Sequence, residues 1–285
     1  MAEMGKLNTL EVLRVVEHGM YLQGENNNDI LLPNKYIPEG TKVGDEIEVF
    51  IYRDSEDRII ATTLTPKGMV GDFAYLEVVA VNRIGAFMGW GLEKDLFVPF
   101  KEQRVKMQQG QKYVVGIYID ESSDRIAASS KLYQFLDDDM PEFSTNEEVE
   151  AFIYDENEIG YNCLVNEQFV GIIYESDVVT NLEVGQKVKA YVQKVRPDKK
   201  VDLSLLPSGY GKVDDIATGI LNKLKENDGY IALSDKSPSE TINLKLGISK
   251  KNFKKAIGSL YKKKLIEIEK IGIRLTEEGK KYNEL

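Results

Sequence analysis

The sequence predicts a mainly β protein with a C-terminal α+β domain, made of three tandem five-stranded barrels and a smaller helical unit. Three observations support this fold class. A pair of glycines separated by 25 residues occurs three times: Gly19 and Gly44, Gly85 and Gly110, Gly160 and Gly185. Runs that alternate apolar and polar residues, as half-buried strands do, recur in the same phase within each copy. After residue 211 the apolar spacing changes to that of amphipathic helices.

Each of the three copies predicts a small closed antiparallel barrel of the OB type, because five short strands fit into about 60 residues. The copies cover residues 6–65, 69–135 and 146–207, and clusters of Gly, Asn, Asp and Pro bound their strands. The first glycine of each pair stands where one strand follows another, which suits a β-bulge or a sharp bend.

Linker-like segments separate these copies. Pro66-Lys67-Gly68, Asp137 to Pro141 and Pro207 to Gly211 each interrupt the alternating pattern. We therefore expect four domains: a first barrel at 1–67, a second at 68–140, a third at 141–208 and a last domain at 209–285.

The last domain is expected to be a winged helix. A first helix is predicted over 215–226, and Ser237-Pro238-Ser239-Glu240 is a helix start for a second that ends near Gly247. Ser249 caps a third helix that reaches Lys264. Two alternating runs, 265–269 and 272–276, complete a hairpin. Three helices and a hairpin make a relative of the helix-turn-helix.

Composition argues against several classes of function. With one cysteine (Cys163) and one histidine (His18), a zinc site of the usual ligands is excluded, and no cofactor is expected. No phosphate-binding glycine motif or nucleophile elbow is present, so we expect no enzyme and no small-molecule substrate. No apolar run is long enough to span a membrane, and no signal peptide is recognised. We expect a cytoplasmic protein, with Cys163 as a buried apolar residue.

Charge is distributed unevenly along the chain. The net charge is −10, but residues 212–285 hold 16 Lys and Arg against 11 Asp and Glu. The net charge of +5 on this C-terminal part suggests a polyanionic partner, although a solubilising lysine surface is the alternative. Residues 1–67 carry −5 and residues 68–140 carry −3. We expect the first two barrels to bind nucleic acid poorly, and either to contact a protein partner or to act as spacers.

Aromatic and cationic residues in the barrels are candidates for single-strand binding, in which bases stack on rings and cations follow the phosphates. The first barrel offers Tyr21 with Arg58, and the second offers Phe87 with Arg83 and Arg125. Tyr161 and Tyr174 are weaker candidates in the third. The alternative is that Tyr21 and Phe87 only cap the barrel cores.

Two basic segments are expected to form one continuous cationic track. The third barrel contributes Lys187, Lys189, Lys194, Arg196, Lys199 and Lys200, from a segment (186–212) with a local charge of +5. The third helix of the last domain contributes Lys250, Lys251, Lys254, Lys255 and Lys262. Apart from Asn252, that helix lacks residues suited to reading bases, so its lysines would contact phosphates. The alternatives are a solvated hairpin and an ordinary exposed helix face.

Several segments resemble the S1 domain, an RNA-binding OB fold. Ile84-Gly85-Ala86-Phe87-Met88 is similar to the family's Phe-Gly-Ala-Phe-Val, and Lys200-Val201-Asp202-Leu203-Ser204 to its Arg-Ile-x-Leu-Ser. Gly171 to Val178 is similar to Gly-Leu-Val-His-Ile-Ser-Glu-Leu, and Gly185 to Ala190 to Gly-Asp-x-Val-x-Val. The order of modules resembles the conserved virulence factor B family of bacterial RNA-binding regulators.

This chain departs from the S1 pattern at binding positions. The family's phenylalanine before the glycine is replaced by His18, Ile84 and Ile159, and Asn162 stands where Tyr21 and Phe87 provide an aromatic ring. The family's histidine is replaced by Leu32, Val98 and Tyr174.

The sequence and the resemblance together predict a non-enzymatic RNA-binding protein that acts after transcription. It would hold single-stranded RNA with little sequence preference. One alternative is a transcription regulator that binds DNA through the winged helix. The other is a scaffold that docks proteins through the acidic barrels.

Overall fold

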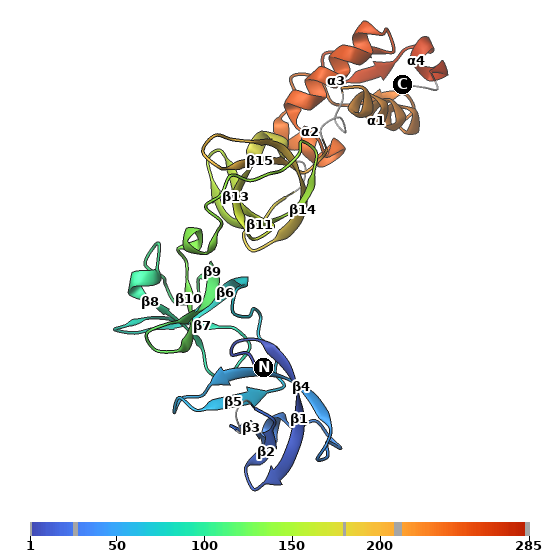
Figure 1. Cartoon of the computed structure of the whole chain (residues 1–285). Coiled ribbons are helices and arrows are strands. Elements are labelled where there is room, and N and C mark those ends of the chain that lie inside the picture. Colours follow the sequence, from blue (N-terminus) through green and yellow to red (C-terminus); the bar gives the residue numbers. More distant parts are fainter. Residues whose placement is uncertain (1, 25–27, 179–180, 208–212, 283–285) are drawn as a thin grey trace. The chain divides into compact units, whose positions relative to one another are not determined.

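The computed structural model describes residues 2–24, 28–178, 181–207 and 213–282. These residues divide into two compact units, unit 1 (Met1–Leu136) and unit 2 (Asp137–Leu285), each of which is described by itself (Figure 1). Three closed five-stranded barrels precede a helical domain with a small sheet. The predicted fold class, tandem OB-type barrels followed by a winged helix, is confirmed.

The three barrels share one topology. In each, the strands follow the order 1-2-3-5-4 around the barrel, with strands 3 and 5 parallel and all other neighbours antiparallel. A single 3₁₀ turn follows the third strand of each barrel: η1 (Asn34–Tyr36), η2 (Phe100–Glu102) and η4 (Glu175–Asp177). The strands of barrel 1 are β1 (Leu7–Val16), β2 (Gly19–Leu22), β3 (Ile30–Pro33), β4 (Glu46–Arg53) and β5 (Ile59–Thr62). Those of barrel 2 are β6 (Phe73–Val81), β7 (Gly85–Gly89), β8 (Leu96–Pro99), β9 (Lys112–Asp120) and β10 (Arg125–Ser129). Those of barrel 3 are β11 (Glu148–Asn157), β12 (Gly160–Val165), β13 (Phe169–Tyr174), β14 (Lys187–Val195) and β15 (Val201–Ser204).

The first glycine of each pair is required by close packing rather than by a bulge at that position. A Cβ atom on Gly19, Gly85 or Gly160 would collide with a backbone carbonyl oxygen of the neighbouring third strand, that of Leu32, Val98 or Ile173. The expected bulge exists, but it lies on the first strand. The register shifts between Val12 and Arg14, Val78 and Ala80, and Ile153 and Asp155.

The second glycine of each pair fastens that bulge. Gly44, Gly110 and Gly185 adopt left-handed backbone angles, with φ of 90°, 80° and 90°, which glycine adopts without a Cβ clash. Each donates its N–H at 2.8 Å to the carbonyl of the bulge residue, respectively Val12, Val78 and Ile153. The first glycine of each pair lets the second strand pass close to the third, and the second glycine forms the turn that closes the bulge. The constant spacing of 25 residues is the length of chain between these two positions.

Barrels 1 and 2 are joined through one hydrophobic core. Phe50, Tyr52 and Ile60 of barrel 1 are buried in the same apolar cluster as the core of barrel 2. The Phe50 ring meets the edge of Trp90, with centroids 5.7 Å apart and planes at 84°. Backbone bonds reinforce the contact, because Val70 N donates to Gly5 O at 3.0 Å. A 3₁₀ turn, η3 (Leu132–Phe135), follows barrel 2 and packs Phe135 against Phe73.

The C-terminal domain contains the expected helices and two additional elements. Its helices are α1 (Val213–Glu226), α2 (Ser239–Leu246) and α3 (Lys250–Lys262). Ser249 caps α3, as predicted, by accepting a hydrogen bond from Asn252 N at 3.3 Å. The predicted hairpin, β17 (Ile266–Ile268) and β18 (Ile273–Leu275), gains a third strand from β16 (Tyr230–Ile231). A short helix, α4 (Glu277–Lys281), was also not predicted.

Candidate nucleic-acid interfaces

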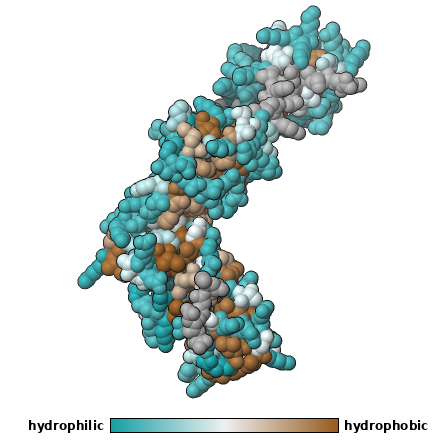
Figure 2. Space-filling view, viewed as in Figure 1, coloured by the Kyte–Doolittle hydropathy of each residue, from teal (hydrophilic) through white to brown (hydrophobic). Residues whose placement is uncertain are grey.

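The lysines of α3 lie opposite its buried face. Phe253, Ala256, Ile257 and Leu260 are buried in the domain core, which turns Lys251, Lys254, Lys255 and Lys262 to solvent. Among the residues that the structure describes, none of these four, nor the half-buried Lys250, has a carboxylate within ion-pair distance. The winged-helix domain is mainly hydrophilic on the face drawn in Figure 2. The row is therefore a cationic surface that is not neutralised by the described part of the chain.

A gap lies within this row of lysines. A Cβ atom added to Gly258 would meet no atom within 4 Å, and helical periodicity places this residue between Lys251, Lys255 and Lys262. A phosphate backbone can therefore approach the helix closely at this point.

The six predicted cations of barrel 3 are all held in ion pairs. On β14, Lys187 contacts Glu150 at 2.9 Å and Glu167 at 2.7 Å, and Lys189 contacts Glu148 at 2.9 Å. The remaining pairs are Lys194 with Asp202, Arg196 with Asp198 and Asp202, Lys199 with Asp138, and Lys200 with Asp198. Most of these carboxylates lie outside the segment 186–212. The sequence count of +5 therefore overstates the positive charge of this surface.

Asp202 organises one side of barrel 3. Its side chain is only 7% exposed, and it accepts a hydrogen bond from the Tyr174 hydroxyl at 3.3 Å. Lys194 lies 3.3 Å and Arg196 lies 3.9 Å from its carboxylate oxygens. The half-buried Tyr174 is thus fixed beside two cations.

Tyr161 does not fit the predicted stacking role. Its ring is 6% exposed and belongs to the core cluster of barrel 3, and burial raises the pKa of its hydroxyl. A base has no open face of this ring on which to stack. The prediction for Tyr161 was wrong because the residue after the glycine points into the barrel, whereas the second residue after Gly85 points outward.

Tyr21 has a different cationic neighbour from the one predicted. The guanidinium of Arg14 lies over the half-buried Tyr21 ring, 4.3 Å from its centroid, and also pairs with Asp29. Arg58 instead contacts Asp54 at 2.7 Å and Glu56 at 3.1 Å. Arg14 faces Tyr21 because the two residues are paired across β1 and β2, just after the bulge.

A groove with a volume of about 470 Å³ lies within unit 1, where barrel 2 meets the end of β4. Its aromatic wall is the half-buried pair Phe87 and Phe97, which face each other across β7 and β8 with ring centroids 5.1 Å apart. The predicted Arg125 lines the groove, whereas Arg83 is exposed in the turn that precedes β7. The other lining residues are Tyr52, Arg53, Ile84, Trp90, Lys94, Asp95, Leu96, Asp120, Ser123, Ile126 and Ala127.

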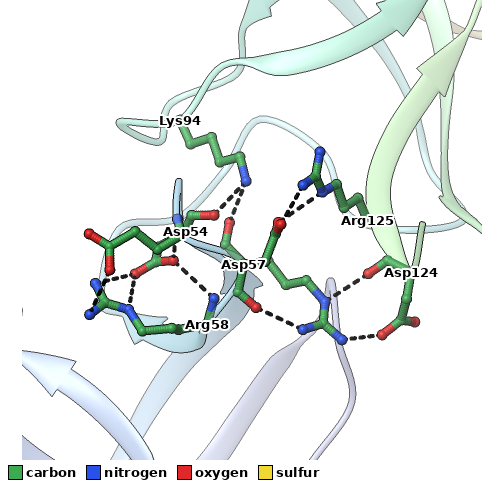
Figure 3. Close-up of polar contacts among 8 residues, drawn as sticks. Asp54, Asp57, Arg58, Lys94, Asp124 and Arg125 are labelled. Carbon is green, nitrogen blue, oxygen red and sulfur yellow. Dashed lines mark hydrogen bonds and ion pairs between the residues drawn. The ribbon is translucent and has the colours of Figure 1, made fainter.

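Ion pairs between the two barrels border this groove (Figure 3). Arg125 Nε donates to Asp57 at 2.8 Å, and its guanidinium holds both Asp57 carboxylate oxygens. Arg53 pairs in return with Asp124. Arg125 therefore holds the pKa of the Asp57 carboxyl below its usual value. Lys94 donates to the carbonyl oxygens of Arg53 and Asp54, at 3.0 and 2.7 Å, and burial lowers its pKa.

Four residues near these sites were not among the predicted candidates: Phe97, Lys94, Arg53 and Arg14. Phe97 was recognisable, since it alternates with the buried Leu96 and Val98 and therefore faces outward. No local sequence pattern indicates a role for Lys94 or Arg53, because their positions depend on the packing of one barrel against the other.

No cluster of His, Cys, Asp or Glu side chains suited to a metal occurs among the described residues. In the same part of the chain, no helix combines the length and apolarity needed to cross a bilayer. Cys163 is fully buried, and burial raises the pKa of its thiol.

Tandem OB-type barrels and a winged helix define a protein of the nucleic-acid-binding class. Residues 4–64 match the S1 domain model, residues 134–207 match the second domain of virulence regulatory factor CvfB, and residues 218–275 match the CvfB-like winged helix domain. The chain is similar to the conserved virulence factor B family along most of its length. S1 and winged-helix domains are not enzyme families.

Similar proteins extend over nearly the whole chain. Conserved virulence factor B of Staphylococcus saprophyticus is 27% identical over 97% of this chain and 95% of its own length. The Staphylococcus aureus protein of the same name is 28% identical, with the same coverage. A multidomain protein with nucleic acid binding domains from Streptococcus pneumoniae has a crystal structure that is 25% identical. It covers 96% of this chain and 98% of its own, with a TM-score of 0.42.

Proposed function

We propose that this protein binds single-stranded RNA with little sequence preference and acts after transcription, without catalysing a reaction. The observation that carries the proposal is the row of exposed lysines on α3, for which the described residues supply no carboxylate partner. Lysines of this kind contact phosphates and position a nucleic acid without specifying its sequence. A location in the cytoplasm, where its RNA would be met, is part of the same proposal.

Among the proposed RNA-binding cations of the described residues, those without a carboxylate partner lie mostly in the winged helix. Barrel 3 has a secondary role, because a phosphate would have to displace a carboxylate from each of its cations. The ion pairs of Lys187, Lys189, Lys199 and Lys200 are exposed at both partners, and such pairs contribute about 0–1 kcal/mol each, so displacement by RNA costs little. These four lysines therefore stay in the proposed site as exchangeable contacts. Lys194 and Arg196 stay in it as the weaker contacts, because displacement would leave the buried carboxylate of Asp202 without its cations.

A transcription regulator that binds duplex DNA is the competing function for a winged helix. Such a regulator reads base edges in the major groove, most often with Arg, Asn or Gln. Asn252, half-buried at the start of α3, is the only residue of these types on the helix. This composition favours phosphate contacts over base recognition.

A competition assay separates the two functions. The full chain is bound to a labelled, unstructured RNA of ten to twenty nucleotides and challenged with equal concentrations of nucleotide as unlabelled RNA or duplex DNA. We expect the RNA to displace the label and the duplex to displace it poorly. More efficient displacement by duplex DNA, together with a preference among duplex sequences, would support the transcription regulator instead.

A further inference from the structure

The helix α3 carries an exposed aromatic ring in its last turn, beside the lysine row. Tyr261 follows the buried Ile257 by four residues, a spacing that predicts a core position. Its side chain is nevertheless 57% exposed and lies outside the apolar cluster that forms the domain core. Aromatic rings that lie exposed among cations are the surfaces on which single-stranded nucleic acids stack their bases. Tyr261 is therefore placed to contact a base rather than to hold the domain together.

Gly258 leaves an open space next to this ring. The residues three or four positions from it, which border it on the helix surface, are Lys254, Lys255, Tyr261 and Lys262. Aromatic side chains of a helix lean toward the preceding turn, which directs the Tyr261 ring toward Gly258. The ring does not fill the space above the glycine, because an added Cβ atom would meet no described atom within 4 Å. Three lysines and one ring thus surround an accessible stretch of helix backbone.

The fold gives no reason for a glycine at position 258. Its backbone is helical and is not among the glycines with a positive φ. Apart from proline, glycine is the least favourable residue in a helix interior. None of the described residues comes close enough to exclude a side chain here. Alanine would therefore stabilise α3, and the advantage that glycine offers is the close approach of another molecule to the backbone.

Gly219 of α1 shows that an open glycine alone does not make such a site. A Cβ atom at this position would also meet no described atom within 4 Å. Of the four residues three or four positions away, only Lys223 is a lysine and none is aromatic. The amino group of Lys223 already donates to Lys245 O at 2.6 Å. Gly258 differs by its surroundings, which combine positive charge with an aromatic ring.

We propose that Gly258 and Tyr261 form a subsite on α3 for one unpaired nucleotide of a single strand. The phosphate lies over the backbone of Gly258, between lysines that have no carboxylate partner among the described residues, and the base stacks on the Tyr261 ring. This inference rests on the proposed function and deepens it. Phosphate contacts alone do not distinguish a single strand from a duplex, whereas a stacking ring does.

The position of Tyr261 separates this subsite from duplex recognition. Helix-turn-helix proteins read the major groove with the N-terminal residues of the recognition helix, but Tyr261 lies in the last turn of α3. A base offers a free face to a ring only where it is unpaired and unstacked. The subsite therefore accepts a single strand and excludes the interior of a duplex.

The test measures the affinity of the full chain for two labelled decamers by fluorescence anisotropy. One is a decamer of uridine, and the other is an abasic decamer with the same sugar–phosphate backbone. Because only the first decamer offers bases to the protein, the comparison separates the contribution of the ring from that of the phosphate contacts.

Tyr261→Ala is expected to weaken binding of the uridine decamer by about 5- to 150-fold, the loss of one base–aromatic stack, and to leave the affinity for the abasic decamer unchanged. Tyr261→Phe restores the ring and should recover the affinity for the uridine decamer. Tyr133→Ala is the control, because it removes a ring that is 68% exposed in unit 1, and it should change neither affinity.

Gly258→Ala provides a second and independent signature. It should weaken binding of both decamers by about fivefold, the contribution of one phosphate contact at roughly 0.1 M salt. It should also raise the thermal midpoint of the helical circular dichroism signal by several degrees. Gly219→Ala is the matched control, which should raise the midpoint similarly and leave both affinities unchanged. A loss of affinity in a more stable variant cannot result from misfolding.

Three results would overturn the inference while the proposed function stands. The first is a Tyr261→Ala variant that binds the uridine decamer as tightly as the unsubstituted protein. The second is an equal loss of affinity for both decamers in that variant, and the third is a Gly258→Ala variant with unchanged affinities. If the unsubstituted chain binds neither decamer, the proposed function fails together with the inference.

Discussion

Phe50→Ala is expected to lower the free energy of unfolding of unit 1 by about 3–5 kcal/mol, the usual cost of removing a buried phenylalanine. Phe50 is fully buried and belongs to barrel 1, but its ring packs against Trp90 of barrel 2. The denaturation midpoint recorded by Trp90 fluorescence should therefore fall, although the substitution lies in the other barrel. Both barrels should unfold in one transition, because they share one core.

Phe152→Ala is the matched control for this prediction. Phe152 is 3% exposed in barrel 3, so the same change of side chain creates a similar cavity in unit 2. The Trp90 midpoint should stay where it is in the unsubstituted protein. An unchanged midpoint in Phe50→Ala, or two separate transitions in unit 1, would show that barrels 1 and 2 fold independently.

Replacement of Lys251, Lys255 and Lys262 by glutamine is expected to weaken binding of unstructured RNA by about 100-fold at roughly 0.1 M salt. Each phosphate neutralised on a single strand contributes a factor of about fivefold at this salt concentration, through the release of counterions. The slope of log affinity against log salt should also fall in magnitude by about 2. Fluorescence anisotropy over a salt series gives both quantities.

A second triple variant controls for loss of charge alone. Lys236, Lys245 and Lys280 are exposed in the same domain but outside α3. Their replacement by glutamine removes the same formal charge and should reduce the affinity several-fold at most. Equal losses in both triple variants would mean that the domain attracts RNA by its overall charge, without a defined surface.

The sequence was most informative where the backbone geometry leaves a residue no alternative. The repeated glycines predicted the barrels correctly because Gly85 must avoid the carbonyl of Val98 and Gly110 must adopt a left-handed turn. Both demands recur at a fixed distance along the chain. The cap of α3 was equally predictable, since Ser249 satisfies a local hydrogen bond.

The remaining features depend on contacts between residues far apart in the sequence. Phe50 and Trp90 look like ordinary core residues of separate barrels, so their shared core leaves no local pattern. Similarly, the charge of barrel 3 cannot be summed along β14, because Lys187 and Lys189 are paired with glutamates of β11. The ion pair between Arg125 of barrel 2 and Asp57 of barrel 1 could not be predicted from the sequence for the same reason.

The proposed function is tested most directly by ultraviolet crosslinking of the intact protein to unstructured RNA, followed by identification of the attached peptides. We expect crosslinked peptides from the α3 segment and, in smaller amounts, from the segment of barrel 3 that runs from Lys187 to Lys200. Absence of crosslinks, or crosslinks confined to other segments, would contradict the proposed function.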